Sequence, residues 1–163
     1  MNFYNNITSP IDYLQDIRIN IYVVGSKDAG SRSSGTFVRS SDVCSSDLLL
    51  SDLESRGLLD TTLVVWTSEF GRTSYGESGN GRDHNPWGYT QWLAGGGAKA
   101  GYTHGETDEI GLKSLGKGVD TYDLHATVLN LMGLDHLKVT YLNNGRSERP
   151  TVVYGDVVKE LIA

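Results

Sequence analysis

The sequence changes character at about residue 49, and this break constrains most strongly what the chain can fold into. Residues 26–48 read SKDAGSRSSGTFVRSSDVCSSDL, a stretch with eight serines and too few apolar side chains to build a core. From Leu49 onward, apolar runs alternate with glycine-rich turns. We therefore expect the folded unit to lie in residues 49–163. The ordinary explanation of the serine-rich stretch is a flexible linker between two modules.

A sharper explanation comes from residues 40–48, which read SSDVCSSDL. They match, at every position, the conceptual translation of a widely used sequencing adapter, and such remnants carry no evolved structure. On this interpretation the chain divides into residues 1–39 of doubtful origin, an adapter-like segment at 40–48, and an evolved segment at 49–163. Cys44, the one cysteine, is then a passenger, and a single cysteine excludes an intrachain disulfide.

Charge and hydropathy exclude two classes of partner. The formal net charge is −6, with 14 basic and 20 acidic residues, and no basic stripe is available to neutralise the phosphates of a nucleic acid. No apolar run approaches the roughly 20 residues needed to span a bilayer. No signal peptide is visible, and the sequence leaves the compartment and the oligomeric state open.

The segment from Leu49 predicts an α/β sheet flanked by helices, because helical and strand patterns alternate along it. Residues 62–67 form an unbroken apolar and β-branched run, which is typical of a strand covered on both faces in a parallel sheet. Residues 89–94 predict a second strand. Upstream, the alternation at residues 17–23 also predicts a strand. A short helix is expected to begin at Leu49, with a glycine at its end.

The C-terminal third predicts two further helices and a hairpin. Apolar residues recur at helical spacing over 124–132, and Asp123 is a reasonable N-cap for that helix. Asn144-Gly145 predicts a hairpin turn between strands at 139–142 and 151–154. A short last helix is expected over 157–162.

Candidate ligands follow the first predicted strand and precede the second. Glu69 stands just after residues 62–67, while Asp83 and His84 lie before residues 89–94. Carboxylate oxygen and imidazole nitrogen suit zinc-like cations, and ligands in open α/β sheets bind beyond the strand ends. Arg72 and Arg82 flank these residues, and arginine suits bidentate recognition of phosphate or sulfate. Spacing alone leaves the alternative that all five are solvated loop residues.

Three ordered stretches resemble a known family: TLVVWTSEFGRTS, GRDHNPWGYTQWLAGGGAKAG and TYDLHATVLNLMGLDH. They are similar to the C-terminal part of an uncharacterised bacterial family catalogued as domain of unknown function fifteen-oh-one. That family is related to sulfatases and the alkaline phosphatase superfamily. The resemblance runs from about Leu49 to Ala163. It implies the C-terminal portion of an alkaline-phosphatase-like sheet flanked by helices.

The resemblance also implies roles for individual residues. Superfamily members carry an Asp-His-Gly signature whose first two residues bind metal, and it is matched here by Glu69, Phe70 and Gly71. Glu69 keeps a carboxylate, whereas Phe70 cannot ligate a metal. His84 matches a metal-binding histidine, and Asp83 is expected to ligate the metal or to orient His84. The implied cofactor is a divalent ion, zinc or calcium.

The implied activity is metal-dependent hydrolysis of a sulfate or phosphate ester. The substrate would be a small anionic ester, recognised by Arg72 and Arg82. The nucleophile of such enzymes lies in an N-terminal half that has no match before Leu49, so the chain is expected to be a fragment that is inactive alone. Relatives of this kind are often exported, but the compartment of this chain stays open. The alternative is a non-catalytic binding or scaffold domain of the same fold, which Phe70 supports.

Overall fold

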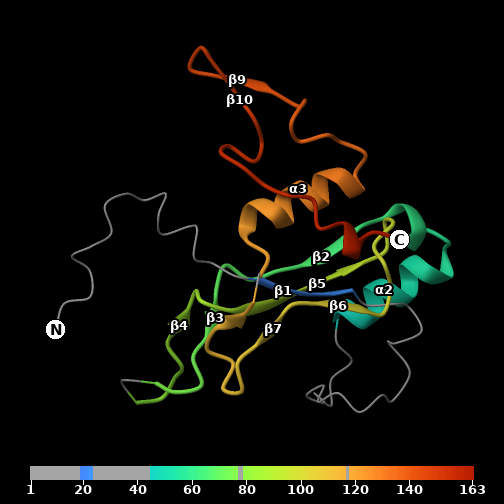
Figure 1. The fold of residues 1–163 in the computed structure, drawn as a ribbon. Coiled ribbons are helices and arrows are strands. Elements are labelled where there is room, and N and C mark those ends of the chain that lie inside the picture. Colours follow the sequence, from blue (N-terminus) through green and yellow to red (C-terminus); the bar gives the residue numbers. More distant parts are fainter. Residues whose placement is uncertain (1–18, 24–44, 77–78, 117) are drawn as a thin grey trace.

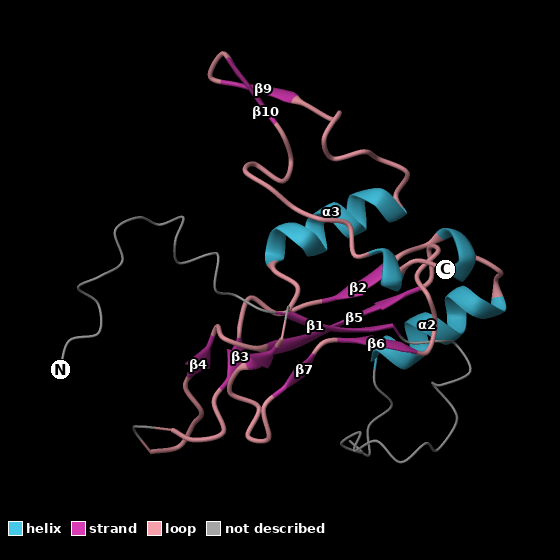
Figure 2. Ribbon diagram, viewed as in Figure 1, coloured by secondary structure: helices cyan, strands magenta, loops and turns pink. Residues whose placement is uncertain are grey.

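The computed structural model describes residues 19–23, 45–76, 79–116 and 118–163. They form an α/β arrangement in which helix α3 lies over one face of a four-stranded sheet (Figures 1 and 2). The α/β class predicted from the sequence is therefore confirmed. The strand order is β2-β5-β1-β6, with bounds Val64–Trp66, Tyr89–Ala94, Ile19–Val23 and Tyr102–His104 respectively.

Strand β5 organises this sheet and agrees with the strand predicted at 89–94. It pairs in parallel with β1 and antiparallel with β2, while β1 pairs antiparallel with β6. The prediction of a doubly covered parallel strand at 62–67 is wrong, because β2 is antiparallel and lies at an edge of the described sheet. Trp66, stacked on Trp92 at 6.3 Å, remains 49% exposed. An apolar run reports which side chains avoid water, but the connections decide strand direction.

Regular structure begins upstream of the compositional break. The strand predicted at 17–23 is present as β1, which lies between β5 and β6 although it belongs to the segment of doubtful origin. The helix expected from Leu49 is α2, Ser45–Ser55, and it starts inside the adapter-like segment. Gly57 follows it with φ +66°, as a C-terminal glycine should. A 3-10 turn, η2 (Leu59–Thr61), connects α2 to β2.

The core lies between β5 and α3. One face of β5 supplies Tyr89 and Leu93, which pack with Val119, Leu124 and Leu161. Leu93 and Leu161 are fully buried. Partly buried apolar side chains from several elements surround this cluster: Leu63, Ala98, Tyr102, Val128, Leu131 and Val158.

Helix α3, Thr121–Leu131, begins three residues before the predicted start, because Asp120 and not Asp123 is its N-cap. The Asp120 carboxylate accepts hydrogen bonds from the Tyr122 and Asp123 amides at 2.8 and 2.9 Å. Asp123 instead occupies the third helical position and accepts from the Asp120 amide, which completes a capping box. Burial and a side-chain hydrogen bond to Asp120 raise the pKa of Tyr154.

The C-terminal region departs from prediction after its turn. Asn144 and Gly145, with φ of 49° and 80°, form the predicted hairpin turn, but it joins β9 (Tyr141–Asn143) to β10 (Arg146–Glu148). The strand predicted at 151–154 is therefore wrong, since a two-residue loop pairs the residues directly beside it. The last predicted helix is only a 3-10 turn, η3 (Lys159–Leu161). The β9–β10 hairpin projects away from the sheet (Figure 1).

We expect Asp120→Ala to lower the free energy of unfolding by about 1–2 kcal/mol, because two amides of α3 lose their cap. Asp120→Asn should stay within about 0.5 kcal/mol of the parent chain, since an amide oxygen can still accept both bonds. His125→Ala, at an exposed position on the same helix, is the matched control. Urea unfolding followed by circular dichroism measures all three, and equal stabilities for the two Asp120 variants would contradict the capping assignment.

Candidate functional site

Two short strands carry most of the predicted site residues. β3 (Gly71–Arg72) pairs antiparallel with β4 (His84–Asn85), so that Arg72 lies directly opposite His84 and Gly71 opposite Asn85. The pairing continues one residue further, where the Thr73 amide donates to the Asp83 carbonyl at 3.0 Å. Residues about ten to fourteen positions apart in the sequence are thus brought face to face in a β3–β4 ribbon.

Glycine lets this ribbon lie directly on the start of β5. A Cβ added to Gly71 would come within 2.8 Å of both the Gly88 carbonyl oxygen and Tyr89 Cβ. A Cβ on Gly88 would lie 2.9 Å from the Ser114 amide nitrogen. Gly71 and Gly88 therefore permit two close backbone approaches. The ribbon packs on one side of residue 88, and a second hairpin packs on the other.

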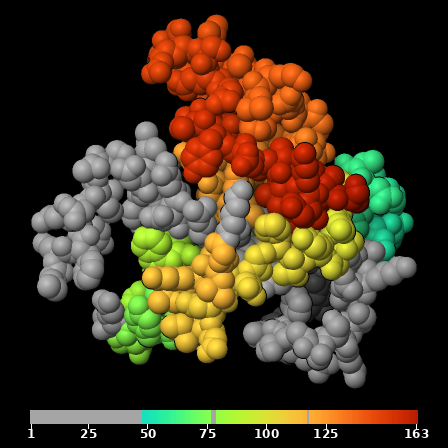
Figure 3. Space-filling view, in the orientation of Figure 1, coloured from blue at the N-terminus to red at the C-terminus, as the bar shows by residue number. Residues whose placement is uncertain are grey.

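The second hairpin pairs β7 (Glu106–Thr107) with β8 (Ser114–Leu115), and residues 108–113 form its tip. The Asp108 carboxylate orders this tip by accepting hydrogen bonds from the Leu112 and Lys113 amides at 2.7 and 3.2 Å. The space-filling view places this hairpin against the ribbon (Figure 3).

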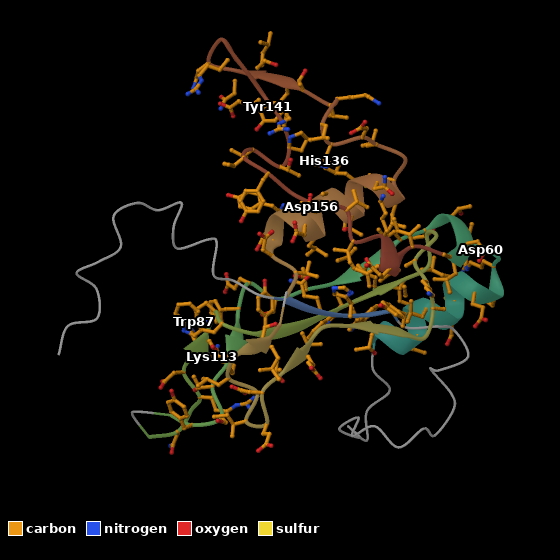
Figure 4. All side chains as sticks on the ribbon, in the orientation of Figure 1. Asp60, Trp87, Lys113, His136, Tyr141 and Asp156 are labelled. Carbon is orange, nitrogen blue, oxygen red and sulfur yellow. The ribbon has the colours of Figure 1, made fainter. Side chains whose placement is uncertain are left out.

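A smaller cleft of about 220 Å³ contains two of the predicted ligands, Asp83 and His84. Lys113 from the hairpin tip and Trp87 also line it, and Figure 4 shows these two side chains close together beside the ribbon. The full lining is Thr73, Tyr75, Asp83, His84, Asn85, Trp87, Leu112 and Lys113. This cleft therefore combines an acid, a histidine and a lysine.

A larger cleft of about 400 Å³ contains both predicted substrate-binding arginines, Arg72 and Arg82. It is lined by Trp66, Ser68, Phe70, Gly71, Arg72, Arg82, Gly88, Tyr89, Thr90, Thr107 and Gly111, and no carboxylate stands among them. Burial raises the pKa of the Tyr89 phenol, which therefore stays neutral and adds no negative charge. Glu69 is exposed and lines neither cleft.

Phe70 links the two clefts. Its ring stacks on the His84 imidazole with 3.8 Å between ring centroids, and the Arg72 guanidinium lies over the same ring at 5.4 Å. Arg72 Nη1 also donates to the Arg82 carbonyl at 3.1 Å. Phe70, which replaces a metal-binding residue in the pattern that the resemblance implies, here orients one histidine and one arginine by ring contacts.

The described residues do not by themselves fit a divalent metal ion. Nowhere in residues 19–23, 45–76, 79–116 or 118–163 do three His, Cys, Asp or Glu side chains gather as a metal site requires. Glu69 lies outside the cleft that holds Asp83 and His84. Lys113 lines that cleft, and its ammonium group disfavours a second cation there. The zinc or calcium ion implied by the resemblance stays a prediction.

Sequence reasoning missed three residues that shape the clefts: Asn85, Asp108 and Lys113. Asp108 carried a usable signal, because an Asp before a glycine-containing loop often accepts hydrogen bonds from the amides that follow. The sequence holds no such signal for Lys113, since nothing in the residue pattern indicates that residues 106–115 fold back on the ribbon.

Comparison with known proteins finds a match to one family model. A sequence model described as "Protein of unknown function (DUF1501)" matches residues 38–162. The chain belongs to this family. The match begins upstream of Leu49, where we expected the resemblance to start, and it includes residues 40–48. Searches of curated proteins and of solved structures yielded no match for the DUF1501 chain. None of its described helices has the length and apolarity needed to cross a membrane.

We expect Gly88→Ala to lower the free energy of unfolding by about 1–3 kcal/mol, because the new methyl group would press on the backbone at Lys113 and Ser114. Gly81→Ala is the matched control, since a Cβ there meets nothing within 4 Å. Thermal unfolding of both variants measures the difference. Equal stability of the two would show that the β7–β8 hairpin does not pack on Gly88 as described.

Proposed function

We propose that this chain supplies the anion-recognition part of a hydrolase of sulfate or phosphate esters, within an alkaline-phosphatase-like fold. One observation carries the proposal: two guanidinium groups, Arg72 and Arg82, line one cleft, and no carboxylate is among the described residues that line it. Such a cleft favours a bound oxyanion even in a chain whose formal net charge is −6.

The two arginines differ in how far they are oriented before a ligand binds. Arg72 is held by Phe70 and by the Arg82 carbonyl, so part of its side-chain entropy is already lost. The Arg82 guanidinium has no hydrogen bond or ion pair with the residues that the structure describes, which leaves its donors available to a ligand. Hydroxyl groups of Ser68, Thr90 and Thr107 line the same cleft and can supply further donors.

The hydrolytic part of the proposal rests on the resemblance of the three sequence stretches to sulfatase-like proteins. No nucleophile is assigned within the described residues, and Asp83 and His84 are two candidate ligands where a metal centre needs more. We therefore propose that the chain binds the ester but does not hydrolyse it alone.

A second function has one observation in its favour. The Phe70 ring stacks on the His84 imidazole, so an aromatic contact exists where the resemblance implies a metal-binding pair. A binding or scaffold domain of the same fold, without chemistry, would retain the anion cleft and this contact.

We expect inorganic sulfate and phosphate to bind this chain through Arg72 and Arg82. Arg82→Ala should raise the Kd by about tenfold or more, because a charge-assisted hydrogen bond contributes roughly 1.5–3 kcal/mol. Arg72→Lys should bind with intermediate affinity, since it keeps the charge and loses the planar fork. Isothermal titration calorimetry at fixed ionic strength measures each Kd.

Arg146→Ala is the matched control, because Arg146 lies on β10 in the projecting hairpin and lines neither cleft. It removes the same charge from the chain without touching the site. If Arg146→Ala and Arg82→Ala weakened binding equally, the effect would be one of net charge and the proposed anion cleft would be wrong.

Metal content and ester hydrolysis are both measured on this chain. We expect it to purify without stoichiometric zinc or calcium and to release no product from aryl sulfate or aryl phosphate esters. Stoichiometric metal that is lost in His84→Ala and kept in Lys113→Ala, measured by atomic emission, would contradict this and support a metal centre in the smaller cleft. Turnover by an intact DUF1501 protein, reduced by the equivalent of Arg82→Ala, would favour the hydrolase over the scaffold.

A further inference from the structure

Among the described residues that line the two clefts, Asn85 makes the most side-chain hydrogen bonds. It is 1% exposed, although the ribbon around it is largely open to water. Its Nδ2 donates to the Leu112 carbonyl at 2.8 Å, and it lies 3.4 and 3.5 Å from the Gly88 and Gly111 carbonyl oxygens. Its Oδ1 accepts from the Trp87 amide at 3.1 Å. Both polar ends of the carboxamide are thus satisfied by backbone groups.

Those backbone groups belong to two segments, and neither segment pairs with the ribbon in a β-sheet. Gly88 and Trp87 belong to the turn between β4 and β5, while Gly111 and Leu112 belong to the tip of the β7–β8 hairpin. One backbone bond, from the Ser114 amide to the Trp87 carbonyl at 3.0 Å, joins these segments directly. The Asn85 carboxamide is therefore the group that ties the ribbon, the turn and the hairpin tip together.

The hairpin tip is also a wall common to both clefts. Gly111 lines the larger cleft with the two arginines, and Leu112 and Lys113 line the smaller cleft with Asp83 and His84. We propose that Asn85 is the positioning residue of the site: it holds the hairpin tip against the ribbon and thereby sets the shape of both clefts. For the larger cleft this inference rests on the proposed anion-binding function.

Asn85→Asp tests the hydrogen-bonding role of the side-chain amide, because the substitution changes almost no volume. The variant keeps an oxygen to accept from the Trp87 amide, but a carboxylate oxygen then faces the Leu112 carbonyl, where a donor stood. Two acceptors repel, so the tip should leave the ribbon.

The experiment compares hydrogen-exchange protection of the amides of Leu112, Lys113 and Ser114 in the parent chain and in Asn85→Asp at one neutral pH. We expect protection of the tip to fall at least tenfold in the variant, while α3 stays protected. The sulfate Kd of the variant should rise about tenfold. Asn80→Asp, at an exposed position, is the matched control for the added charge.

Unchanged protection of the tip in Asn85→Asp would overturn the inference. A parent chain that does not bind sulfate would overturn the proposed function instead, and tip protection would still decide the role of Asn85. If the variant does not fold, the parent chain provides the test: the Asn85 side-chain amide protons should exchange slowly by NMR, and rapid exchange would refute the inference.

Discussion

Burial of one face of β5 against α3 is the interaction on which the other features depend. Tyr89 and Leu93 on that strand meet Leu124 of the helix and Leu161 near the C-terminus, and removing these groups from water supplies the main favourable free energy of folding. The same strand pairs with β1 and β2. Its first residue, Tyr89, contacts the core and the larger cleft at once, so the site is attached directly to the most buried part of the molecule.

The site itself depends on backbone contacts rather than on a large apolar surface. Gly71 and Gly88 allow the ribbon and the β7–β8 hairpin to approach the start of β5 closely. Asn85 and Asp108 then satisfy the backbone groups that such irregular segments leave unpaired. These contacts explain how two clefts with different charged side chains form beside the same short strands. Two arginines gather in one cleft, and an acid, a histidine and a lysine gather in the other.

Prediction from the sequence was most successful where a local signal sets the structure. The strand at 89–94, the helix that ends before Gly133 and the Asn144-Gly145 turn all depend on neighbouring residues, and all are present. Among the site residues, Asp83 and His84 line one cleft and Arg72 and Arg82 line another, while their roles as metal ligands and anion-binding groups stay predictions. Glu69 does not join either cleft, because position after a strand does not determine where a loop side chain lies.

The sequence by itself therefore determined the α/β class, the main elements and the family, since these depend on hydrophobic periodicity, turn residues and motif order. The tertiary structure alone decided that β2 is antiparallel, that Phe70 stacks on His84, and that residues 111–113 form a wall of both clefts. These outcomes arise from contacts between segments distant along the chain. Local residue patterns cannot encode them, because the partner of each group is chosen only when the chain packs.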